Sequence, residues 1–171
     1  MTTTAELLVD AFGRIRDGVH SALAGATPAD LAWRPDPGAN STAWLVWHLT
    51  RVQDDHVADV AGTEQVWTAG GWADRFGLDR PVGSIGYGDS AADVAGVTVT
   101  DVDLLTGYHD AVAEQTTRWV AGLTDADLSR VVDESWDPPV TLAVRLVSVV
   151  SDDLQHVGQA GYLAGLLARS R

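Results

Sequence analysis

Four stretches of the chain place apolar residues at intervals of three and four, the spacing that gathers them on one face of an α-helix. The predicted helices cover residues 3–23, 43–60, 101–123 and 141–168. Residues typical of helix boundaries accompany this pattern: N-cap side chains in Asn40-Ser41-Thr42 and at Asp101, and a stop at Pro138-Pro139 before the last helix. The sequence therefore predicts an all-α protein built from four helices.

A long connection between the second and third helices, residues 62–100, breaks this pattern. It is rich in glycine, contains Pro81 and keeps no helical period for long. Connections of this length are uncommon in a compact domain and often functional. Its aromatic residues either cover a pocket or only pin the connection to the helices; they are Trp67, Trp72, Phe76 and Tyr87.

The length and apolar content predict one domain spanning residues 1–171, because 46% of the 171 residues are hydrophobic. The amino-terminal residues lack the basic and apolar regions of a signal peptide, and Arg145 breaks the longest apolar stretch, residues 140–150. We therefore expect a cytoplasmic protein.

The charged residues exclude several functions. All 11 basic residues are arginine, against 24 acidic residues, and the formal net charge is −13. The surface would repel nucleic acid and acidic membranes, so neither is an expected partner.

The absence of lysine excludes Schiff-base and P-loop chemistry. The absence of cysteine excludes thiolate zinc sites and a cysteine nucleophile, so any sulfur chemistry needs a thiol from outside.

Two polar residues, Asp152 and His156, interrupt the apolar face of the fourth helix. They lie at positions i and i+4, one above the other, among residues typical of a core: Leu142, Leu146, Val149, Ala160, Leu163 and Leu167. Burying an unpaired carboxylate there would cost on the order of several kcal/mol. Asp152 is therefore expected to be paired or to ligate a metal.

His48 is the counterpart on the second helix, between Leu45 and Val52 on its inner side. If the two helices pack side by side, His48, Asp152 and His156 can converge on one point. Two imidazoles, one carboxylate and an open position are typical of a catalytic zinc site, although nickel, iron or manganese would also accept them. The alternative is a buried Asp–His hydrogen bond with a purely structural role.

The remaining histidines have different expected roles. His56 lies about 12 Å from His48 along one helix, at 1.5 Å per residue, so both cannot bind one ion. His20 is expected on the surface. His109, on the inner face of the third helix, is a candidate to line the pocket.

Residues 44–56, WLVWHLTRVQDDH, and residues 151–161, SDDLQHVGQAG, resemble the DinB superfamily. The similarity is greatest to an actinobacterial branch that contains mycothiol S-transferases and mycothiol-dependent maleylpyruvate isomerase. It extends over the whole chain. The resemblance implies a DinB-like four-helix bundle that binds one divalent metal, usually zinc, through His48, Asp152 and His156. Many members have His or Glu where this chain has Asp152.

This resemblance implies a metal-dependent mycothiol S-transferase that conjugates the thiol to electrophilic small molecules in detoxification. The metal would present the cofactor thiol as a thiolate. Arg51, Asp55 and Trp44 are candidates for binding the thiol cofactor, although Arg51 and Asp55 could instead form a surface ion pair. Candidates for the apolar pocket are Trp44, Trp47, Trp67 and Trp72. Family members are often dimers, so a homodimer is a further expectation.

Other functions remain open from the sequence. A metal-dependent hydrolase would activate water, with Asp55 or His109 as general base. A non-catalytic metal-binding or small-molecule-binding bundle would use Asp152 and His156 only for stability. Isomerase-like members usually carry a further carboxyl-terminal domain, whereas this chain ends at Arg171, which favours the transferase.

Overall fold

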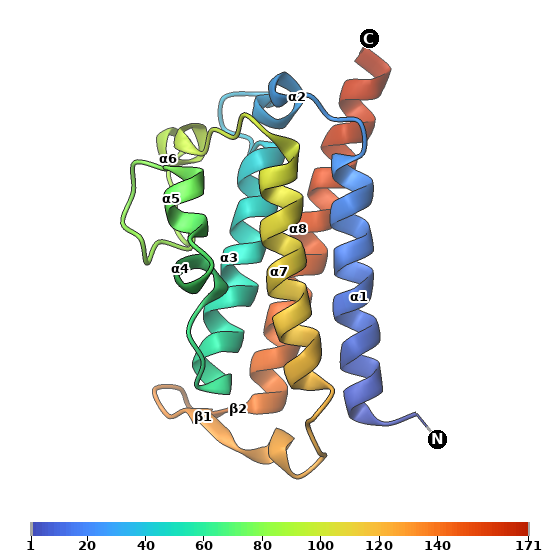
Figure 1. Ribbon diagram of the computed structural model, residues 1–171, viewed down its shortest axis with the longest axis vertical. Coiled ribbons are helices and arrows are strands. Elements are labelled where there is room, and N and C mark those ends of the chain that lie inside the picture. The colour runs from blue at the N-terminus through green and yellow to red at the C-terminus, as the bar shows by residue number, and fades with distance from the viewer. Residues whose placement is uncertain (1, 171) are drawn as a thin grey trace.

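Four long helices pack as a bundle in the computed structural model, which describes residues 2–170 (Figure 1). They are α1 (Thr4–Leu23), α3 (Thr42–Ala61), α7 (Val102–Val120) and α8 (Leu142–Ser170). Helices α1 and α3 each pack against both α7 and α8. The predicted fold class is therefore confirmed. No helix among the described residues is long and apolar enough to cross a membrane.

The helix boundaries follow from capping interactions near the predicted positions. The Thr3 side chain accepts a hydrogen bond from the Glu6 amide, and the Glu6 carboxylate accepts one from the Thr3 amide. The Ser41 hydroxyl caps α3 by accepting from the Trp44 amide. The prediction was wrong about the end of α7, which stops three residues earlier than residue 123.

Several short elements were not predicted. They are the helices α2 (Pro28–Ala32), α4 (Val66–Ala69), α5 (Trp72–Phe76) and α6 (Ala91–Gly96), the 3₁₀ turn η1 (Asp127–Ser129), and the strands β1 (Val131–Asp133) and β2 (Val140–Thr141). The two strands form an antiparallel hairpin in which Val131 pairs with Thr141 and Asp133 with Val140. This hairpin lies at the end of the bundle where α3 ends and α8 begins (Figure 1).

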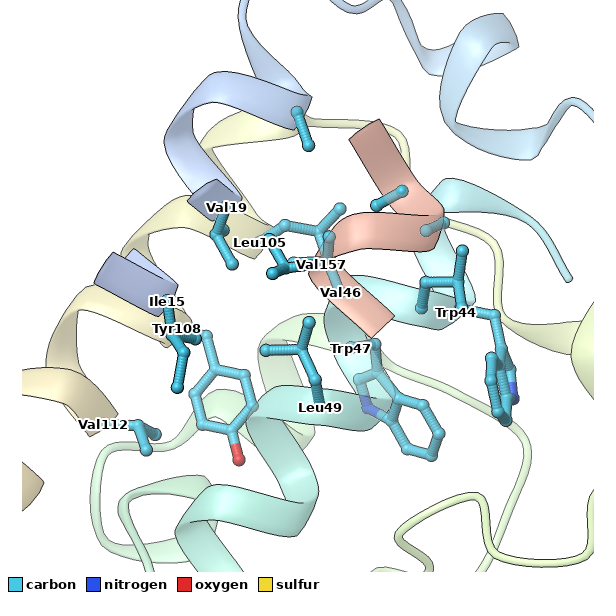
Figure 2. Packing of buried hydrophobic residues seen from close by; sticks show 14 of the residues in the cluster. Ile15, Val19, Trp44, Val46, Trp47, Leu49, Leu105, Tyr108, Val112 and Val157 are labelled. Carbon is cyan, nitrogen blue, oxygen red and sulfur yellow. The ribbon is translucent and has the colours of Figure 1, made fainter. Parts of the chain in front are cut away.

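Large apolar side chains from all four long helices fill the interior (Figure 2). Ile15 and Val19 come from α1, Val46 and Leu49 from α3, and Val157 from α8, all almost fully buried. Close packing of this kind holds α3 and α8 side by side, which is the condition that the predicted site required.

The connection 62–100, which carries α4, α5 and α6, packs on the outer side of α3 and α7 through its aromatic residues. Trp67 lies 5.2 Å from Tyr108 and 5.2 Å from Phe76 between ring centroids, and Trp72 lies 5.6 Å from Tyr108. The Asp54 carboxylate ties this packing to α3 by accepting hydrogen bonds from the amides of Val66 and Trp67. These aromatics therefore pin the connection to the bundle.

Candidate metal centre and its cavity

His48 on α3 and Asp152 and His156 on α8 meet inside the bundle. Each offers one ligand atom, and these atoms lie within 4.8 Å of one another. His48 is buried, and the other two are half-buried. The structure thus brings together the three residues that the sequence singled out as metal ligands.

Hydrogen bonds fix both imidazoles with the same nitrogen facing the centre. The Nδ1–H of His48 donates to the Ile85 carbonyl oxygen at 2.5 Å, and the Nδ1–H of His156 donates to Gln159 Oε1 at 2.9 Å. A neutral imidazole carries one proton, so Nε2 of each ring keeps its lone pair for a metal. Outer hydrogen bonds of this kind orient histidine ligands in metal sites.

The Asp152 carboxylate also fits a metal. Its Oδ1 lies 3.6 Å from His156 Nε2, whereas its buried Oδ2 has no hydrogen-bond partner among the described residues. Burial opposes ionisation of Asp152, but the neighbouring His156, with His48 and His56, outweighs this effect and lowers the pKa of the carboxyl group. A charged carboxylate with an unused buried oxygen is typical of a cation ligand.

The connection 62–100 holds the Trp44 ring of α3 against His48. The ring of Trp44 stacks on His48 with centroids 4.5 Å apart, and its indole N–H donates to Asp89 at 2.8 Å. Arg80 donates to the same Asp89 oxygen at 2.9 Å. Burial lowers the pKa of His48, which keeps the ring neutral and able to ligate.

A cavity of about 340 Å³ opens beside two of the three candidate ligands, His48 and Asp152. Helices α3 and α8, the β1–β2 hairpin and the connection 62–100 all contribute to its wall. The lining residues are His48, Val52, His56, Ile85, Tyr87, Asp133, Trp136, Val140, Val144, Arg145, Ser148, Val149 and Asp152. Two of its aromatics are exposed: Trp136 by 67% and Tyr87 by 92%. The wall is largely apolar, and both aromatics are free to contact a ligand.

The candidates for the thiol-binding role lie in different places. Arg51 is fully buried, outside the cavity lining, and donates to Ser84, Gln65 and Tyr108. It forms an ion pair with Asp54 at 3.6 Å.

Asp55 is half-buried and accepts from Gln65; it lines a neighbouring polar hollow. Trp44 contacts two of the candidate ligands: it stacks on His48 and meets His156 edge-on, with ring centroids 6.0 Å apart. Arg51 was expected near His48, where it could bind the thiol cofactor. It instead lies outside the cavity, because the connection 62–100 buries the outer side of α3.

The prediction for His109 was wrong. Its side chain is completely buried, with Nδ1 3.1 Å from the Thr50 hydroxyl, and it does not line the cavity. Burial lowers its pKa to about 4. Trp47, Trp67 and Trp72 are also buried in the interior rather than forming the pocket wall. His20 lies on the surface as expected, 2.8 Å from Asp110.

Sequence reasoning missed the other end of the cavity, where His56, Arg145 and Asp133 meet. Arg145 donates one hydrogen bond to His56 Nδ1 at 2.9 Å and another to Asp133 at 3.1 Å. The arginine that breaks the apolar run of residues 140–150 was the available signal. The hairpin that brings Asp133 and Trp136 to the cavity has strands too short to predict from periodicity.

Comparison with known proteins agrees with this architecture. The crystal structure of a conserved protein of locus from Enterococcus faecalis has 30% sequence identity over 96% of each chain and a TM-score of 0.90. No curated protein sequence matches the chain. The sequence model of the DinB superfamily matches residues 11–160, most of the chain. The protein therefore belongs to the DinB superfamily.

Proposed function

We propose that the protein is a divalent-metal-dependent S-transferase that conjugates an external thiol, mycothiol, to electrophilic small molecules. The observation that carries the proposal is the convergence of His48, Asp152 and His156, the first two of which line a cavity with largely apolar walls. Because the chain has no cysteine, the sulfur must come from a bound cosubstrate. The resemblance to the mycothiol-dependent branch of the family suggests which thiol is used.

Several residues of the chain would have separate roles in this reaction. Zinc or another divalent ion held there would lower the pKa of a thiol. Ile85 and Gln159 keep His48 and His156 in the tautomer that ligates. Asp152 supplies one negative charge beside the ion. Val52, Val140 and Val149 line the apolar wall and limit the water around the reacting groups.

The hydrolase alternative receives less support from the geometry. Its two candidate general bases do not line the cavity: His109 is buried in the interior, and Asp55 lies in the neighbouring hollow. His56 does line the cavity, but its Nδ1 lone pair is already used by Arg145. A non-catalytic binding bundle remains an outcome of the experiment below, and a homodimer stays a prediction.

The test combines metal content with thiol consumption. Untagged protein is analysed for metal and then assayed with mycothiol and 1-chloro-2,4-dinitrobenzene, in which the thiolate displaces chloride to form a thioether. We expect about one divalent ion per chain and a catalysed reaction. His48→Ala should abolish both. The matched control is His20→Ala, because His20 lies on the surface away from the cavity.

Each other result has a distinct meaning. An unchanged rate in His48→Ala would contradict the S-transferase proposal. Conversion of a test ester without added thiol would favour the hydrolase. Bound metal without turnover across a panel of electrophiles would favour the binding bundle. Absence of metal, even after reconstitution, would leave Asp152 and His156 with a structural role only.

A further inference from the structure

The hydrogen bond between Arg145 and His56 determines the tautomer of His56. A guanidinium group only donates hydrogen bonds, and Arg145 Nη1 lies 2.9 Å from His56 Nδ1. His56 Nδ1 must therefore accept, and the single proton of the neutral ring is on Nε2. Burial and the adjacent Arg145 both lower the pKa of His56, which keeps the ring neutral.

The Nε2–H of His56 is a donor without an acceptor among the described residues. No hydrogen bond from this atom to any of residues 2–170 is present, and the side chain is 30% exposed where it lines the cavity. Buried polar groups are normally paired with protein or with water, and this partly exposed donor is open to both water and a ligand. A ligand in the cavity can supply the missing acceptor.

This donor and the candidate metal centre lie at opposite ends of the cavity. His48 and His56 are both on α3, eight residues apart, which is about 12 Å along the helix. Between them the wall is formed by Val52, Val140 and Val149. A ligand that reaches both ends therefore needs an apolar body and one polar end.

Charge at this end favours a neutral acceptor over an anion. Arg145 is the only cation among the lining residues, and its Nη2 already donates to Asp133 at 3.1 Å. A ligand carboxylate would thus add a negative charge beside a pair that is already balanced. The net charge of −13 on the whole chain also disfavours anions.

We propose that His56, oriented by Arg145, binds the carbonyl oxygen of the electrophile, and that the protein selects uncharged substrates with an aromatic or apolar body and a ketone or amide oxygen. The exposed rings of Trp136 and Tyr87 at the same cavity would contact the body of such a molecule. The proposal rests on the proposed function in treating the ligand as an electrophile. The binding that it describes can nevertheless be measured without any reaction.

The experiment compares three probes of similar shape on metal-loaded protein without thiol. They are 4-phenylbutan-2-one, the carboxylate 3-phenylpropanoate, and butylbenzene, which has no oxygen. We expect the ketone to bind about 10-fold more tightly than the other two, the effect of one good hydrogen bond. His56→Phe should remove this preference and leave butylbenzene binding unchanged, whereas His20→Phe should change neither.

A second measurement does not depend on any substitution of His56. At pH 8 the ¹⁵N spectrum of the wild-type protein should show His56 with Nε2 protonated and Nδ1 unprotonated, and the ketone should shift the Nε2–H signal. Arg145→Met should allow both tautomers. This readout separates a donor role for His56 from a purely structural tie between α3 and the hairpin.

Several results would overturn the proposal. These are unchanged ketone affinity in His56→Phe, equal or tighter binding of 3-phenylpropanoate, no binding of any probe, and an Nδ1-protonated ring in the wild-type spectrum. Failure of the S-transferase assay with intact ketone selectivity would instead contradict only the proposed function. The two failures are therefore distinguishable.

Discussion

Gly86 lies so close to His48 that a Cβ atom added to the glycine would come within 2.8 Å of His48 Nδ1. The same atom would lie 3.0 Å from the Trp47 ring and 3.3 Å from the Trp44 ring. Gly86 also has a φ of +89°, where side chains are strained. A glycine here allows the Ile85 carbonyl to reach the imidazole.

Gly86→Ala should therefore weaken metal binding. The added methyl group must displace the chain at Ile85, which breaks its hydrogen bond with His48, and loss of such an outer contact typically costs about 10–100-fold in metal affinity. Competition with a chelator measures this change. The control is Gly88→Ala, since Gly88 has a φ of +75° but nothing within 4 Å of an added Cβ. Equal affinities in the two variants would contradict the proposed role.

Asp54→Asn should loosen the connection 62–100. Asp54 accepts from the amides of Val66 and Trp67 and from the Tyr108 hydroxyl. The variant removes the charge that faces the buried Arg51, and breaking a buried pair costs about 3–5 kcal/mol.

Urea unfolding should show this loss, and amide exchange should accelerate first within residues 62–100. Asp55→Asn is the control, because Asp55 is half-buried and accepts one side-chain hydrogen bond, from Gln65. A uniform increase in exchange over the whole chain would argue against a local effect.

His109 should make stability depend on pH between about 6.5 and 4. Burial lowers its folded-state pKa to about 4, whereas the unfolded chain takes up the proton near 6.5. The unfolded state therefore binds the proton first as the pH falls. This residue should remove about 3 kcal/mol of stability by pH 4, and no more below that.

Unfolding free energies of the wild-type protein and His109→Gln, measured at several pH values, isolate this contribution. The difference between the two proteins should be constant above pH 7 and change in favour of the variant as the pH falls. Parallel curves down to pH 4 would show that His109 does not titrate in this way.

Trp136→Ala should affect ligands much more than folding. Trp136 is 67% exposed, so the free energy of unfolding should change by about 0.5 kcal/mol or less. Loss of an aromatic contact should weaken 4-phenylbutan-2-one binding about 10-fold. Tyr162→Ala is the matched control, because Tyr162 is 64% exposed on α8 but does not line the cavity. Equal effects in both variants would exclude Trp136 from the ligand site.

The sequence predicted the long helices and the candidate metal ligands for the same reason. Apolar spacing on α3 and α8 defines an inner face, and polar residues on that face are visible as interruptions. His48, Asp152 and His156 interrupt it in this way. Their meeting then needed only that the two helices be neighbours.

The rest of the cavity could not be predicted, because it depends on contacts between distant segments. Arg51 reads as a surface residue on α3 until residues 62–100 cover it. His56 and Trp136 reach one cavity only because the β1–β2 hairpin folds back at the end of α3. Helices of four to six residues and strands of two or three carry too little periodicity to predict.

The placement of the candidate ligands on α3 and α8 also bears on how long the fold persists. An ion shared by His48 and Asp152 would cross-link two helices that are remote in sequence, and through Ile85 it would engage the long connection as well. Separating α3 from α8 would then require the ion to leave first. Metal binding would thus slow unfolding and protect residues 62–100 from proteases. The lifetime of the folded state would therefore depend on the supply of metal.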